Sequence, residues 1–146
     1  MKAHRFALSV PTTPIAVTAA RRQAVDAIEG WDAGLGTGVV HTAELVISEF
    51  VTNAVQHAGG DLVSLTVRLD EATLRIEVGD ACPVLPRPAL PDLYSESGRG
   101  LFLVAVLTHR YGVEPTADGK RCWAEIALPS SPNPEIDFSL PLQRSC

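Results

Sequence analysis

Three polar residues with chemically useful side chains recur at intervals of four along the sequence: Glu49, Asn53 and His57. We predict a helix over residues 41–58, on which this spacing stacks them along the seam between an apolar arc and a polar arc. A carboxylate there can take a proton from a hydroxyl group or a water, and an amide oxygen is a hard ligand suited to Mg²⁺. The same pattern also fits ordinary boundary residues of an amphipathic helix. The apolar arc comprises Ala43, Val46, Ile47, Phe50, Val51, Ala54 and Ala58.

Two further features follow later in the chain. Asp80 ends a strand-like stretch just before a proline-rich segment, and Gly98-Arg99-Gly100 precedes an apolar run. Alone, an Asp at a strand end indicates turn chemistry, and Gly-x-Gly marks a tight turn as readily as a phosphate cradle. Their order after the polar helix is more informative, because the free N–H groups at a helix start favour an anion such as a phosphate.

The elements that must position these residues follow from the hydrophobic periodicity. Alternating apolar and polar residues predict strands, and longer amphipathic or Ala-rich stretches predict helices. Residues 81–97 hold four prolines without periodicity, which is typical of a functional loop or lid. We expect an α+β protein, a two-layer α/β sandwich with helices on one face of a mostly antiparallel sheet. The predicted strands are 5–10, 63–69, 74–78, 111–114 and 120–128, and the predicted helices are 15–28, 41–58 and 101–109.

Composition excludes several classes of function. The 146 residues carry 12 Lys+Arg against 17 Asp+Glu, a net charge of −5, which argues against direct binding of nucleic acid. No apolar run approaches the ~18 residues of a membrane span, and no signal peptide is recognisable. The 3 cysteines form no Cys-x-x-Cys pair, so we expect free thiols in a cytoplasmic protein. We expect one domain over residues 1–129 and a loosely ordered, Pro-rich tail over 130–146.

The order of these features resembles the ATP-binding boxes of the GHKL superfamily, which contains gyrase, heat-shock chaperone, histidine kinase and mismatch-repair ATPases. Residues 49–57 look like its asparagine box, Asp80 matches the first glycine box, and residues 97–101 match the second. The sequence is most similar to single-domain bacterial anti-sigma-factor serine/threonine kinases. The resemblance extends over about residues 6–128 and implies a Bergerat-type ATP-binding fold.

The resemblance implies a role for each matched residue. Asn53 would bind Mg²⁺ that bridges the phosphates of ATP, Asp80 would accept the adenine amino group, and Glu49 would be the general base. His57 is a candidate phosphate contact, with a capping role at the helix end as the alternative interpretation. The backbone of the second glycine box would cradle the phosphates, and Arg99 would add positive charge. These ATP-binding candidates are Gly98, Arg99, Gly100 and Leu101.

The implied partners are an anti-anti-sigma factor, whose serine or threonine is phosphorylated, and a sigma factor that is held inactive. The resemblance also implies a homodimer, because members of the family commonly dimerise. An alternative function is a non-catalytic binding module on the same fold, because Cys82 and Val84 replace the two glycines that usually follow Asp80. A histidine-phosphorylating sensor kinase would need an acceptor-histidine helix upstream, and an unrelated metabolic enzyme would need a nucleophile–base spacing. We find neither feature in the sequence.

Overall fold

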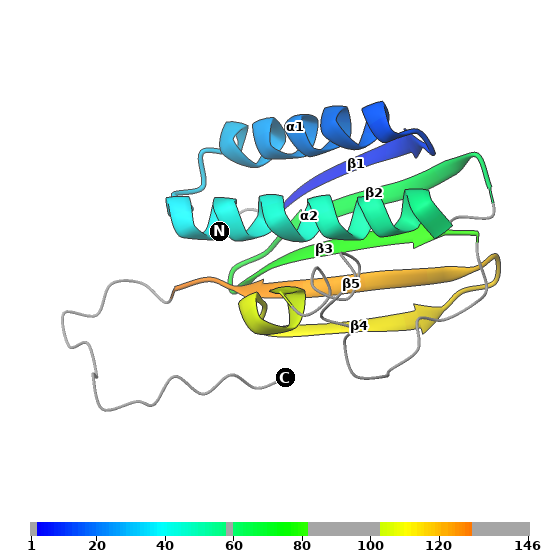
Figure 1. The fold of residues 1–146 in the computed structure, drawn as a ribbon. Helices are drawn as coiled ribbons and strands as arrows, with labels where there is room; N and C mark the ends of the chain where they lie inside the picture. Colours follow the sequence, from blue (N-terminus) through cyan, green and yellow to red (C-terminus); the bar gives the residue numbers. More distant parts are fainter. Residues whose placement is uncertain (1–2, 58–59, 82–102, 130–146) are drawn as a thin grey trace.

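The computed structural model describes residues 3–57, 60–81 and 103–129 and has two layers, a five-stranded sheet and helices that cover one of its faces (Figure 1). This architecture confirms the predicted α+β sandwich. The elements are β1 (His4–Pro11), α1 (Pro14–Gly30), α2 (Thr37–His57), β2 (Leu62–Leu69), β3 (Thr73–Asp80), β4 (Arg110–Pro115) and β5 (Lys120–Ala127).

The sheet has the strand order β1-β2-β3-β5-β4, and every neighbouring pair is antiparallel. The two predicted hairpins are confirmed, β2 with β3 and β4 with β5. In the first turn, the Asp70 carboxylate accepts hydrogen bonds from the backbone N–H groups of Ala72 and Thr73, at 2.9 and 2.8 Å. Because β5 inserts between β3 and β4, the end of β3 lies beside the start of β5.

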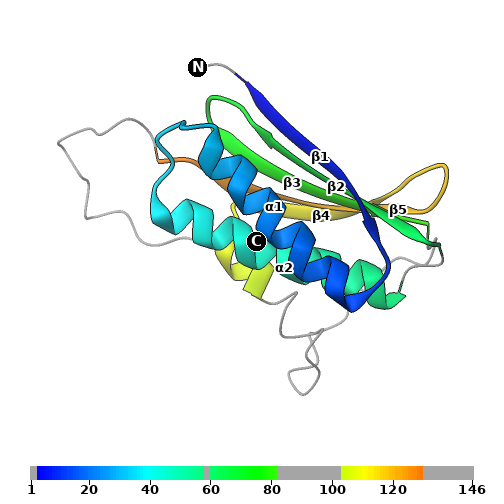
Figure 2. The same cartoon turned by 90° about the horizontal axis from the view of Figure 1, so that it is seen from above.

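The core lies between the sheet and the two long helices, with α2 packed over β2, β3 and β5 (Figure 2). Alternate residues of each central strand face the helices, as the sequence pattern predicts. The described residues of the predicted apolar arc of α2 are all buried. Large side chains with almost no exposed surface include Ile28, Ile47, Leu65, Leu69, Leu74 and Ile76.

Two helices differ from the prediction at one end, and one predicted helix cap lacks its hydrogen bond. The second helix begins at Thr37 rather than at residue 41. Thr13 is the N-cap of α1 and Pro14 follows it as predicted, but the Thr13 side chain makes no capping hydrogen bond. The last helix, predicted over 101–109, is described over residues 103–107. It ends where the Thr108 hydroxyl donates a 2.7 Å hydrogen bond to the Val104 carbonyl, and a strand begins two residues later.

The other face of the sheet is covered by no described helix and carries a network of charges. Arg75 bonds Glu77 and Glu125, each at 2.7 Å, and its guanidinium lies 4.5 Å from the ring centre of Trp123. Arg68 adds a 2.9 Å ion pair with Glu77. These contacts join β2, β3 and β5 across the strands, so they hold in register the two strands whose ends meet at the candidate site.

No helix among the described residues is long and apolar enough to cross a membrane.

Candidate functional site

Two of the three residues of the predicted polar seam of α2 lie at the edge of its buried face. Glu49 and Asn53 are half-buried, beside buried residues such as Phe50 and Ala54. His57 is the last residue of the helix and is exposed. On the opposite side, the Ser48 hydroxyl accepts a 3.4 Å hydrogen bond from Arg21, which ties α2 to α1. Glu49 and Asn53 therefore lie at the edge of the buried face of α2, and His57 does not share their burial.

Asp80 is the last residue of β3 and faces the helix layer. It shares the inward face of β3 with Ile76 and Val78, and its side chain is 2% exposed. Its Oδ1 accepts a 3.2 Å hydrogen bond from Nζ of Lys120, whose side chain is 8% exposed. Lys120 begins β5 directly opposite Asp80. The sheet thus holds a buried acceptor carboxylate at the place where the sequence predicts the base-recognition residue.

Both views show the carboxyl-terminal end of α2 over the same end of the sheet as the end of β3 and the start of β5 (Figures 1 and 2). Asn53 lies one turn before the end of α2, and Glu49 lies two turns before it. The fold therefore brings the half of α2 that carries Glu49 and Asn53 to the same end of the sheet as Asp80, although these residues come from different layers. The fourth member of this group, Lys120, joins them from β5.

Close backbone packing fixes this end of the sheet. A Cβ atom added to Gly119 would lie 2.0 Å from the Asp80 carbonyl oxygen, so the turn before β5 is pressed against the end of β3.

Cys122, two residues after Lys120 on β5, is a half-buried free cysteine. Burial raises the pKa of the Cys122 thiol; the Lys120 charge opposes that shift and the Asp80 charge adds to it. This cysteine is therefore a poor nucleophile at neutral pH.

Sequence reasoning missed Lys120, which it interpreted simply as the start of a strand. The alternation along β5 could have predicted its burial, because successive side chains of a strand point to opposite faces. Lys120 therefore shares the helix-facing side of β5 with Cys122, Ala124 and Ile126. The predicted second glycine box, Gly98, Arg99, Gly100 and Leu101, lies outside the described residues, as do most of the predicted lid and the tail over 130–146.

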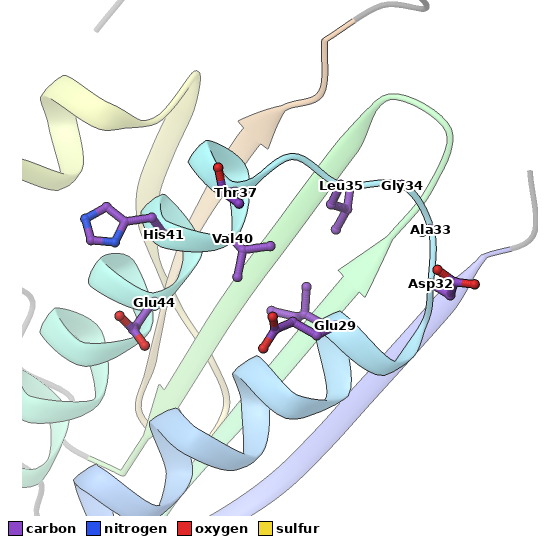
Figure 3. Close-up of a pocket in the computed structure, with 10 residues that line it drawn as sticks. Glu29, Asp32, Ala33, Gly34, Leu35, Thr37, Val40, His41 and Glu44 are labelled. Atoms are coloured by element: carbon purple, nitrogen blue, oxygen red, sulfur yellow. The ribbon is translucent and has the colours of Figure 1, made fainter.

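A cavity of about 450 Å³ lies at the other end of the helix layer, where α1 connects to α2 (Figure 3). Its polar lining residues include Glu29 and Asp32, from the end of α1 and the loop after it, and His41 and Glu44, from α2. The cavity contains none of the predicted site residues. Within the described part of the chain, no group of three or more His, Cys, Asp or Glu side chains is placed to hold a metal ion.

A profile of the histidine kinase-like ATPase domain matches residues 10–125. The chain belongs to the histidine kinase-like ATPase family. This match confirms the family resemblance in the sequence, and it includes Glu49, Asn53, Asp80 and Lys120. Membership in this family implies ATP as the ligand. No curated protein matches the sequence.

Two solved structures share the fold of this ATPase domain. The RsbU and RsbW domains of Rv1364c from Mycobacterium tuberculosis match with a TM-score of 0.61 at 19% identity, over 86% of this chain and 32% of that chain. The histidine kinase domain of the blue-light activated histidine kinase from Erythrobacter litoralis EL346 matches with a TM-score of 0.53 at 23% identity, over 81% of this chain and 61% of that one. At these identities the likeness shows the fold alone.

The described residues fit an adenine nucleotide. A buried, ionisable carboxylate such as Asp80 accepts hydrogen bonds and suits an exocyclic amino group. The half-buried amide of Asn53 offers a hard oxygen for Mg²⁺, and the Glu49 carboxylate lies one turn further from the helix end.

Proposed function

We propose that this chain binds ATP with Mg²⁺ and acts as a serine/threonine kinase of the anti-sigma type. In this role it phosphorylates an anti-anti-sigma partner and sequesters a sigma factor. The observation that carries the proposal is the buried Asp80 carboxylate at the end of β3, beside the end of α2 that bears Glu49 and Asn53. Polar side chains that converge at one end of a domain are a usual mark of a ligand site.

Each residue has a separate task in the proposed kinase. Asp80 accepts the adenine amino group and so selects adenine. Asn53 provides the oxygen ligand for Mg²⁺, which neutralises phosphate charge when it is bound. Glu49 takes the proton from the partner's serine or threonine hydroxyl. The oxygen of that hydroxyl then bonds to the γ-phosphorus as the bond from phosphorus to the β–γ bridging oxygen breaks, which leaves ADP and a phosphorylated partner.

In the proposed kinase, the phosphates of ATP are bound by the second glycine box and by His57. Gly98, Gly100 and Leu101 supply backbone N–H groups for the phosphates, and Arg99 supplies positive charge. His57, exposed at the end of α2, is a further phosphate contact in this account. A domain that shares its fold with a protein containing an RsbW domain supports partner switching as the context.

One feature of the sequence favours a second function. Cys82 and Val84 occupy the positions of the two glycines that usually follow Asp80 in the first glycine box. Side chains there restrict how closely the backbone approaches a base. A non-catalytic binding module, which holds a regulator with weak nucleotide binding or none, is therefore the alternative.

Two substitutions on α2 separate binding from catalysis. We expect Asn53→Ala to abolish saturable Mg²⁺–ATP binding, because it removes the metal ligand. We expect Glu49→Ala to keep binding within about threefold and to lower phosphoryl transfer by roughly 10²–10⁴-fold, the usual contribution of a general base. Calorimetric titration measures the first effect, and radiolabelled phosphate transfer to candidate antagonist proteins measures the second.

Gln56→Ala, an exposed change on the same helix, is the matched control and should alter neither quantity. Full transfer by Glu49→Ala would remove Glu49 from the catalytic role. Transfer by no variant, with ATP binding intact, would favour the binding module.

A further inference from the structure

Lys120 is buried to a degree that is unusual for a lysine. Among the described residues, Lys120 and Thr108 are the polar or charged residues with less than a tenth of their surface exposed, and Lys120 is 7% exposed. Its Nζ lies 3.2 Å from Oδ1 of Asp80, the candidate base-recognition residue. The two residues are directly opposite in the ladder between β3 and β5, and both face the helices. The ammonium group is therefore built into the candidate site.

Stability alone is a weak explanation for such a pair. Two charges lose their hydration on burial, and the attraction between them often does no more than offset that cost. Apolar side chains of similar volume would pack beside Val78 and Ala124 with a smaller desolvation cost. The pair is better explained by a requirement for a carboxylate held in one orientation at this place.

We propose that Lys120 is a positioning residue for nucleotide recognition, which holds the Asp80 carboxylate in the orientation that accepts the adenine amino group. This inference rests on the proposed ATP-binding function. An ionised carboxylate offers about four acceptor positions, so it can bond Lys120 through Oδ1 and an amino group as well.

The surrounding backbone holds Lys120 in this arrangement. The turn before it is pressed against the end of β3, since a Cβ on Gly119 would lie 2.0 Å from the Asp80 carbonyl oxygen and 2.7 Å from Cα of Ala81. Lys120 and Asp80 therefore meet through a rigid contact between two strand ends. Removing the ammonium group removes the hydrogen bond that fixes Oδ1 of Asp80 in its present orientation.

The test uses one substitution that removes the charge and one that keeps it. Lys120→Met preserves the apolar stem without the ammonium group, and Lys120→Arg preserves the charge. Each variant is titrated calorimetrically with ATP and with purine riboside triphosphate, which lacks the 6-amino group. We expect wild type to bind ATP more tightly than the purine analogue. In Lys120→Met we expect roughly a tenfold loss of ATP affinity with less than a twofold change for the analogue.

Two comparisons show whether Lys120 acts through Asp80. Lys120→Arg should retain most of the discrimination between ATP and the analogue. The double variant Asp80→Asn, Lys120→Met should bind ATP no more weakly than Asp80→Asn alone, because both changes remove the same interaction. Arg121→Met, which neutralises an exposed cation at the next position, is the matched control and should change neither affinity.

The outcomes separate this inference from the proposed function. If wild type shows no saturable ATP binding, the proposed function fails and the inference fails with it. If wild type binds ATP but Lys120→Met binds it equally well, the inference alone is overturned. Equal losses of ATP and analogue affinity in Lys120→Met would also overturn it, since Lys120 would then support the fold rather than the recognition of the amino group.

Discussion

Gly119 lies in the turn between β4 and β5, against the last residue of β3. The space there accepts no side chain, because a Cβ would lie 2.0 Å from the Asp80 carbonyl oxygen. We expect Gly119→Ala to lower the free energy of unfolding by about 1–3 kcal/mol, as overpacking usually does, and to weaken ATP binding by displacing Asp80. Urea unfolding and calorimetric titration measure the two effects.

Gly38→Ala is the matched control for Gly119→Ala. Gly38 lies in the first turns of α2 and has no atom within 4 Å of an added Cβ. Alanine there should stabilise the protein by roughly 0.5–1 kcal/mol, because it is the better helix former. A Gly119→Ala variant as stable as Gly38→Ala would contradict the close contact at the end of β3.

Glu77, on the outer face of β3, makes the stability of the sheet depend on pH. Burial raises the pKa of Glu77, but the hydrogen bond from Arg75 and the charges of Arg68, Arg75 and Arg121 outweigh it and lower the pKa below its ordinary value of 4.5. A carboxylate with a lowered pKa stabilises the fold above its unfolded-state pKa and loses that contribution as the pH falls through the folded-state value.

We therefore expect the free energy of unfolding to fall as the pH is lowered from about 5, and to fall less steeply in Glu77→Gln. At pH 7 the substitution should cost about 1 kcal/mol, because the pair is only partly shielded from solvent. Urea unfolding over a pH series measures both effects, with exposed Glu29→Gln as the control. Parallel pH curves for wild type and Glu77→Gln would contradict this role.

At the scale of elements, α2 is positioned by its apolar face. Ile47 has no exposed surface in the core, whereas Gln56 on the same helix is exposed. We expect Ile47→Ala to cost about 2–5 kcal/mol of unfolding free energy and Gln56→Ala less than about 0.5 kcal/mol. Thermal and urea unfolding measure the difference. Similar costs for the two variants would mean that α2 packs on the sheet through a different face.

The central elements could be predicted because each has one buried face. Alternation along β2 and β3 and the apolar arc of α2 follow directly from their packing against one another. The start of α2 could not be predicted, since Gly38 favours a loop. Val39 and Val40 pack against the core, and this tertiary contact extends the helix to Thr37.

The candidate site could be predicted in part for a related reason. The places of Glu49 and Asn53 on one side of α2 follow from their spacing, and the place of Asp80 at a strand end follows from the alternation that precedes it. The partnership of Asp80 with Lys120 depends on the pairing of β3 with β5, which are 40 residues apart at that point and skip β4 in the sheet order. Local patterns carry no information about such a pairing, so the ion pair required the structure.

The whole molecule places different chemistry at its two ends and two faces. The helix layer covers one face of the sheet, and the other carries the Arg75 network without a described helix over it. The candidate site lies at the end of the sheet where β3 ends and β5 begins, whereas the cavity near Glu29 and His41 lies at the opposite end of α2. We therefore expect ATP to bind at the Asp80 end of the molecule.

Binding of ATP at this end can be tested by calorimetric titration. The whole chain is titrated with ATP and then with GTP, each with Mg²⁺. We expect saturable binding of ATP and at least tenfold weaker binding of GTP, because Asp80 accepts the amino group of adenine. Asp80→Asn should lose this preference while remaining folded. No saturable binding at millimolar ATP would contradict the account and leave a regulatory binding module as the function of the fold.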